Sequence, residues 1–146
     1  SPLTLVNGSF KNWQGMTDSG MRQVVKRIYF DVHSIRLLNS ETRQNLTDKN
    51  MVAPEETEGE VVNIGLFRHY IEAYLRKRDD VSKSATLLVR QLEATQSGVP
   101  IELYFFIGTT DWVSYEQKTS DILEHIYAYA NEFGLQIYEG LPVAST

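Results

Sequence analysis

Two apolar segments separated by a turn-rich linker constrain the fold of this chain more than any other feature. Residues 85–92 and 101–107 alternate, so that every second side chain shares a face, which is the period of β-strands. The linker between them contains Ser97, Gly98 and Pro100, residue types that favour tight turns. We therefore predict an antiparallel hairpin at the centre of a sheet.

Both faces of this predicted hairpin carry large apolar side chains. Leu87, Leu103 and Phe105 share one face, where the helices of the domain would pack. The opposite face is also apolar, through Leu88, Leu92, Tyr104 and Phe106. An isolated domain needs only one apolar sheet face, so we predict that these four residues contact a neighbouring domain or subunit.

The composition excludes several classes of protein. The 146 residues, of which 42% are hydrophobic, suit one domain with a core of its own. Cysteine is absent, which excludes a disulfide framework, a thiolate metal site and a cysteine nucleophile. The net charge of -5 argues against a nucleic-acid partner. No apolar run approaches the roughly 20 residues that span a bilayer.

The periodicity of the remaining chain predicts an α+β domain. Strand patterns cover 24–32 and 135–138, and helical patterns cover 63–78 and 112–133. With the hairpin, the order is βαββαβ, the ferredoxin-like pattern, in which two helices cover one face of a four-stranded antiparallel sheet. A short helix from Ser40 to about Leu46 and an acidic loop form an insertion in the first crossover.

Local signals fix the ends of the predicted helices. Ser40 and Asn63 are predicted to cap the first two helices, and the Thr109-Thr110-Asp111 cluster is predicted to cap the longest one. Gly134 stands where helices commonly end in a left-handed residue. The buried stripe of the longest helix is predicted to begin at Trp112 and to continue at helical spacing, through Tyr115, Thr119, Ile122, Ile126, Tyr129 and Phe133.

The regions flanking this domain are predicted separately. Residues 1–22 read as the terminal β segments of a preceding domain and a linker, because an Asn-Gly turn separates two short alternating runs. In that segment, Phe10 and Trp13 are candidate contacts with a core or a subunit outside the fragment. The predicted domain covers 23–140, and 141–146 is predicted to be a tail.

Motifs for catalysis are missing from the sequence. There is no phosphate-binding loop, no GxGxxG, no GxSxG and no HExxH. His33 follows a predicted strand and His125 lies within a predicted helix, neither with a partner at ligand spacing. We therefore predict no catalytic, metal or cofactor site, and residue patterns alone indicate an interaction or regulatory module.

Four runs of residues give the sequence a family likeness. These runs are Asn63-Ile64-Gly65-Leu66-Phe67-Arg68, Val89-Arg90-Gln91-Leu92-Glu93, Gly98-Val99-Pro100-Ile101 and Phe133-Gly134-Leu135-Gln136-Ile137-Tyr138. In this order they resemble the carboxyl-terminal cytoplasmic region of mechanosensitive channels of small conductance, the MscS family, and most of all its miniconductance, YbdG-like branch. Residues 10–16 are similar to the segment that leaves the middle β domain in that branch.

The resemblance implies a function. Such channels are homo-heptamers of the bacterial inner membrane that open under bilayer tension during osmotic downshock, and a hollow cytoplasmic cage lies below the pore. This chain would contribute part of the cage wall, with transmembrane helices upstream of Ser1 and no small-molecule ligand. Four glutamates of the acidic 49–60 segment would tune cation access to the cage, namely Glu55, Glu56, Glu58 and Glu60. We expect that segment to be a solvated, mobile loop.

The same sequence pattern is also compatible with a soluble sensor or interaction module in place of a channel. A ferredoxin-like sensor of the ACT kind would bind a small metabolite and pair through the second face of the hairpin, and an interaction module would use that face in the same way. A metabolite that raised the thermal stability of the protein would favour the sensor.

Overall fold

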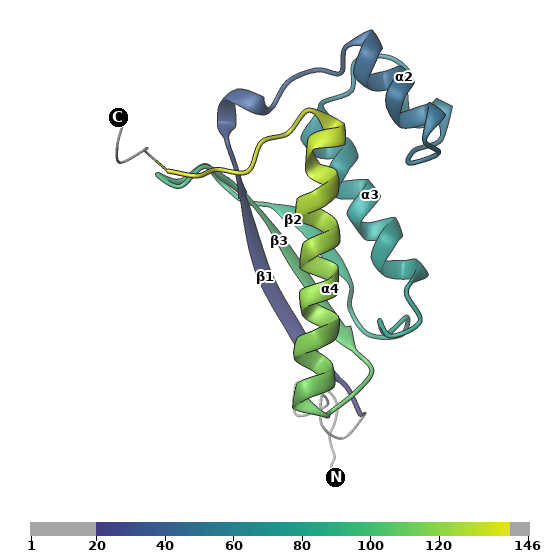
Figure 1. Cartoon of the computed structure of the whole chain (residues 1–146), viewed down its shortest axis with the longest axis vertical. Coiled ribbons are helices and arrows are strands. Elements are labelled where there is room, and N and C mark those ends of the chain that lie inside the picture. The colour runs from purple at the N-terminus through teal and green to yellow at the C-terminus, as the bar shows by residue number, and fades with distance from the viewer. Residues whose placement is uncertain (1–19, 141–146) are drawn as a thin grey trace.

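The computed structural model describes residues 20–140 as an α+β fold. The sheet contains β1 (Arg22–Phe30), β2 (Leu88–Gln91) and β3 (Val99–Ile107). The helices are α2 (Ser40–Asp48), α3 (Asn63–Lys77) and α4 (Trp112–Ala130), with short 3-10 helices η1 (Val32–Ser34), η2 (Pro54–Thr57) and η3 (Asn131–Phe133). Helices α3 and α4 lie side by side against the sheet, and α2 forms a separate lobe at one end (Figure 1).

The predicted hairpin is confirmed, but only its second strand is central. Strands β2 and β3 pair in antiparallel fashion, and the sheet order is β1-β3-β2, so the four-residue β2 lies at an edge of this sheet. The loop is closed by hydrogen bonds from the backbone of Thr95 to Gly98 and back. Gly98 has a φ of +94°, and a Cβ at that position would lie 2.4 Å from the carbonyl oxygen of Phe30. Glycine is therefore required where the loop crosses the end of β1.

Strand β1 begins and ends two residues before the predicted limits. It pairs with β3 along its whole length, with Arg22 opposite Ile107 and Phe30 opposite Val99. The chain leaves the sheet after Phe30 because Asp31 caps η1, its carboxylate accepting a hydrogen bond from the backbone N–H of His33 at 3.1 Å.

The sheet of the described residues has three strands and not the four that the sequence predicted. Residues 135–138 contribute a single antiparallel bridge between Ile137 and Phe30. Two backbone hydrogen bonds flank it, from Asp31 to Gln136 at 2.8 Å and from Tyr138 to Tyr29 at 2.9 Å. A longer ladder does not form because β1 ends at Phe30, so the last segment meets only the end of that strand.

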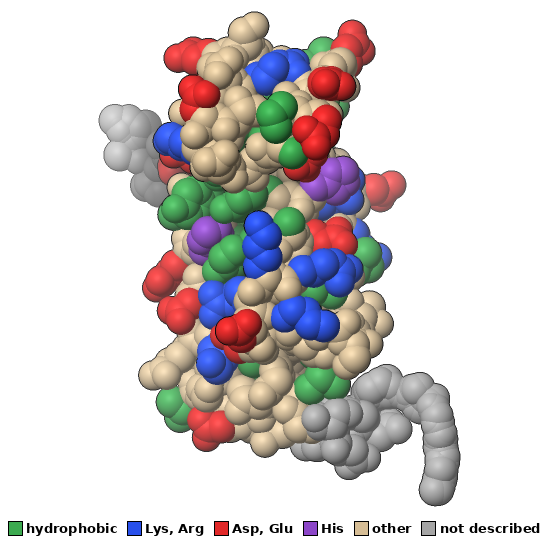
Figure 2. Space-filling view, turned by 90° about the vertical axis from the view of Figure 1, so that its right-hand side faces the viewer, with side chains coloured by type: hydrophobic (Ala, Val, Ile, Leu, Met, Phe, Trp, Pro, Cys, Tyr) green, Lys and Arg blue, Asp and Glu red, His purple; other side chains and the backbone are tan. Residues whose placement is uncertain are grey.

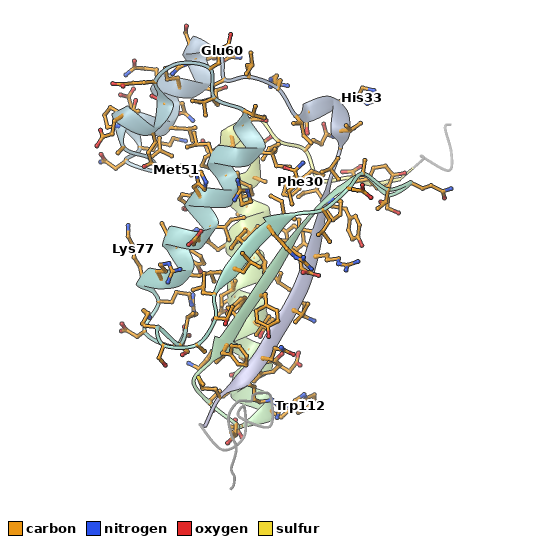
Figure 3. All side chains as sticks on the ribbon, turned by 180° about the vertical axis from the view of Figure 1, so that it is seen from behind. Phe30, His33, Met51, Glu60, Lys77 and Trp112 are labelled. Carbon is orange, nitrogen blue, oxygen red and sulfur yellow. The ribbon has the colours of Figure 1, made fainter. Side chains whose placement is uncertain are left out.

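The core lies between the sheet and the two long helices. The inner face of β3 is fully buried, through Ile101, Leu103, Phe105 and Ile107, as the alternation predicted. Helix α4 buries Thr119, Ile122, Ile126 and Ala130. Trp112 was predicted to begin this stripe, and that prediction is wrong, since Trp112 is 61% exposed. It lies in the first turn of α4, at the far end of the molecule from Glu60 (Figure 3).

The helix ends follow the predictions in part. Asp111 caps α4, accepting a hydrogen bond from the N–H of Ser114 at 2.8 Å, and Gly134 has a φ of +75° after η3. Helix α2 is capped by Asn39 and not by Ser40, because the Asn39 side chain accepts from the N–H of Thr42 at 2.7 Å. The predicted cap of α3 is also wrong, since Val62 holds that position without a side-chain bond.

Asn63 instead joins three segments of the chain. Its side chain is buried, and its Nδ2 donates to the carbonyl oxygens of Ser34 at 2.9 Å and Phe133 at 3.0 Å. Its Oδ1 accepts from the backbone N–H of Arg36 at 3.0 Å. Asn63 therefore fixes the connection after β1 and the end of η3 against the first turn of α3.

The acidic segment is ordered, contrary to the prediction of a mobile loop. Val52 and Thr57 are buried, and residues Pro54–Thr57 form η2. The hydroxyl of Thr57 donates to Pro54 O at 2.7 Å, and Glu56 accepts from the backbone N–H of Ala53 at 2.9 Å. These contacts order a segment whose charge alone would have favoured solvation. The predictions for residues 1–19 and 141–146 lie outside the described residues.

Candidate functional site

The predicted contact surface lies on the sheet face opposite α3 and α4, which we call the outer face. One row across this face is apolar, because Tyr104 of β3 stands between Val25 of β1 and Leu88 of β2. Val25 and Leu88 are each 45% exposed, and Tyr104 is partly buried. The structure therefore places apolar side chains side by side on a surface that neither helix covers (Figure 3).

A second row on the outer face is charged. Glu102 of β3 stands between Arg27 and Arg90, and the backbone register places the three side by side. Arg27 Nε donates to Glu102 Oε2 at 3.0 Å, and Arg90 Nε donates to Oε1 at 2.8 Å. Hydrogen bonds from Arg90 and then from Arg27 lower the pKa of the Glu102 carboxyl. Two half-exposed guanidinium groups around one buried carboxylate leave this row with a net positive charge.

The other predicted contact residues differ in their exposure. Leu92 is partly buried beyond the end of β2, and Phe106 is only 6% exposed, with its ring at 5.8 Å and nearly perpendicular to that of Tyr104. Within the described part of the outer face, the exposed apolar surface is therefore supplied chiefly by Val25 and Leu88. Phe10 and Trp13 lie outside the described residues.

The four candidate ion-access glutamates are all exposed and lie together around η2. Glu55 and Glu56 belong to η2, and Glu58 and Glu60 follow it. Figure 3 shows Glu60 in the α2 lobe, away from the outer face of the sheet. The structure therefore does not bring the acidic residues and the predicted contact residues into one site.

A cluster of aromatic side chains between α3 and α4 was missed by the sequence analysis. The hydroxyl of Tyr70 lies 2.8 Å from His125 Nε2, so His125 has a partner on the neighbouring helix. The imidazole also stacks on the ring of Tyr74, with centroids 3.8 Å apart and planes within 5°, and it packs against Tyr129 at 4.4 Å. The signal was present in the sequence, because residues 70 and 74, like 125 and 129, are one helical turn apart.

Burial changes the titration of this cluster. It raises the pKa of Tyr70 to about 12, with smaller contributions from Tyr129 and Tyr74. Burial, and to a smaller extent the charge of Arg78, lowers the pKa of His125. Arg78 is held by a bidentate pair with Asp80, at 2.9 and 2.8 Å, and donates to the hydroxyl of Tyr74 at 2.9 Å. Asp80 is therefore the ion-pair partner that holds Arg78 in place.

No helix in 20–140 is both long enough and apolar enough to cross a membrane. No group of three or more histidine, aspartate or glutamate side chains in that range could hold a metal ion. No protein-family model matches the sequence.

Proposed function

We propose that this chain is part of the cytoplasmic cage of an MscS-type mechanosensitive channel of the miniconductance, YbdG-like branch. The observation that carries the proposal is the outer face, where Val25 and Leu88 remain 45% exposed beside a positively charged row. A wall of packed subunits would bury such a face, whereas an isolated domain would leave apolar surface in water.

The residues that carry the family resemblance support the proposal by their position. Asn63 opens the first of these runs, and its amide donates to the carbonyl of Phe133, which opens the last. A Cβ on Gly98, in the run that leads into β3, would lie 3.2 Å from Cβ of Tyr138. Three runs far apart in sequence therefore meet at one end of the sheet, as expected if they maintain a common fold.

We also propose that the chain has the ferredoxin-like topology. If the bridge between Ile137 and Phe30 is a shortened fourth strand, it lies next to β1, and the two helices then lie in the crossovers of a βαββαβ fold. In this interpretation α2 and η2 are an insertion in the first crossover.

In the proposed channel, this chain has a structural role and no enzymatic one. Its partners are further copies of itself in a homo-heptamer, and the complete protein lies in the bacterial inner membrane through helices encoded upstream of Ser1. The exposed glutamates around η2 would concentrate cations near the cage wall, since like charges on one surface raise the local counter-ion concentration.

The test uses the full-length protein in a bacterium that lacks its own tension-gated channels. We expect survival of osmotic downshock to require the outer face, so Leu88→Asp should reduce both survival and the yield of heptamer in detergent. Val113→Asp is the matched control, because Val113 is 54% exposed on α4 and away from the outer face. Equal survival and assembly of the two variants would refute the role of this face, and a complete reading frame without upstream apolar helices would refute the channel.

A further inference from the structure

A groove of about 540 Å³ lies between the end of α2, the exposed side of α3 and the end of α4. Met51 lines it from the segment after α2, Tyr70 and Tyr74 line it from α3, and Tyr129 lines it from α4. In Figure 2, hydrophobic side chains and a histidine gather below the α2 lobe, with Lys and Arg side chains beneath them. The volume is within the range of small-molecule sites.

Contacts with His125 hold the aromatic wall of the groove in place. His125 stacks on Tyr74 with ring centroids 3.8 Å apart, packs at a tilt against Tyr129 at 4.4 Å, and its Nε2 lies 2.8 Å from the hydroxyl of Tyr70. The tyrosine rings are thus oriented by contacts within the protein before any ligand arrives. Tyr129 is 37% exposed, so part of this wall is open to a flat ring.

Among residues 20–140, the groove is lined by one cationic side chain that has no ion-pair partner. Lys49 Nζ is 2.8 Å from Glu132 Oε1, so these two opposite charges are paired. On α3, Arg76 pairs with Glu72. Lys77 also lines the groove, and it makes no ion pair within the described part of the chain. An anion would therefore find its counter-charge at Lys77.

We propose that this groove binds a small planar aromatic anion, with its ring against Tyr74 and Tyr129 and its anionic group at Lys77. A nucleoside monophosphate has this chemistry, and so does an aromatic carboxylate. The proposal does not depend on the channel assignment, since it rests only on residues of this groove.

The ligand class is tested on the 146-residue chain by isothermal titration calorimetry and by saturation-transfer NMR of the ligand ring protons. The probes are AMP, adenosine, inorganic phosphate and indole-3-acetate. We expect AMP to bind more tightly than adenosine or phosphate, because of these three only AMP joins an aromatic ring to an anionic group. Binding of indole-3-acetate would show that the groove accepts aromatic anions in general, and binding of AMP alone would show that it requires a phosphate. Equal affinity of AMP and phosphate, or no binding of either aromatic anion, would overturn the proposal.

Two variants locate the site, each with a matched control. Lys77→Gln and Tyr129→Ala should each raise the dissociation constant of the anion that binds by about tenfold, the size of one ion contact or one ring contact. Lys26→Gln and Tyr127→Ala remove the same groups at exposed positions outside the groove and should leave binding unchanged. Circular dichroism of each variant measures whether the fold is retained. If Tyr129→Ala unfolds, Lys77→Gln decides alone, because its side chain is exposed, and an unchanged affinity would refute the site.

Discussion

Replacing Asn63 by alanine tests how much one buried side-chain amide contributes to stability. Asn63 lies at the end of the sheet where three of the runs that resemble the MscS family meet. The substitution removes two donated hydrogen bonds, to Ser34 and Phe133, and one accepted from Arg36. Each such bond contributes about 1 kcal/mol net, so the free energy of unfolding should fall by about 3 kcal/mol. The backbone bond from Asn63 N–H to Arg36 O, at 2.9 Å, is retained, so the first turn of α3 should still form.

Urea unfolding followed by circular dichroism measures this loss, and a thermal melt should show a midpoint lower by roughly 10 °C. Asn131→Ala is the control, because the Asn131 side chain is exposed and makes no hydrogen bond within the described residues. Asn63→Asp keeps the acceptor but turns a carboxylate toward two carbonyl oxygens, so it should destabilise at least as much as Asn63→Ala. If Asn63→Ala stays within about 1 kcal/mol of the control, the clamp does not have the energetic role assigned to it.

Other expected results concern pH, assembly and charge. Because burial, with Arg78, places the folded pKa of His125 below its ordinary value of 6.5, the folded protein binds fewer protons than the unfolded chain around that pH. The contribution of His125 to the free energy of unfolding should therefore be fully present above pH 6.5 and be lost as the pH is lowered. His125→Gln should make the free energy of unfolding, measured by urea titration, less dependent on pH in this range. An unchanged pH dependence would show that it arises from other groups. Hydrogen bonds from Arg90 and then from Arg27 lower the pKa of Glu102, so the parent protein should lose stability as the pH falls from 4.5 toward the folded pKa. Glu102→Gln cannot titrate and should not show this loss. The acid unfolding curves of the two proteins should therefore differ below pH 4.5. The 146-residue chain should be monomeric or weakly associated by light scattering, since the proposed channel gathers its subunits through the membrane part, and a stable heptamer would contradict this. Neutralising the exposed glutamates around η2 in the full-length protein should weaken its preference for cations in patch-clamp recordings, and an unaltered preference would exclude a role for them in ion access.

The fold could be predicted where a segment has one strong period. Alternation in 101–107 predicted the buried inner face of β3. The pattern is clear because β3 is a central strand, paired on both sides, and its inner-face side chains are all buried. The last strand could not be predicted in the same way. Its four residues alternate correctly, but its length as a ladder depends on where β1 ends, which is set by the Asp31 cap and not by the segment itself.

Of the functional surfaces, too, only the features that follow from a local pattern could be predicted. Alternation predicted which hairpin residues face away from the helices, because side-chain direction in a strand follows from position alone. It did not predict that Arg27 and Arg90 would enclose Glu102, since that pairing depends on the register of three strands. The aromatic cluster was missed for a related reason. Tyr70 and His125 are on different helices, 55 residues apart, and no local pattern specifies how two helices are rotated against each other.

The placement of the ends of the domain has a mechanical consequence. Strand β1 enters at one end of the sheet, and the described chain leaves at the other end, beside the loop that joins β2 and β3 (Figure 1). A pull between these two ends would act along β1, which pairs with β3 over nine residues. Such a load shears the whole ladder at once instead of peeling it bond by bond. The domain should therefore transmit tension along its length as a stiff link, and single-molecule pulling from residues 20 and 140 should give a higher unfolding force than pulling across β2 and β3.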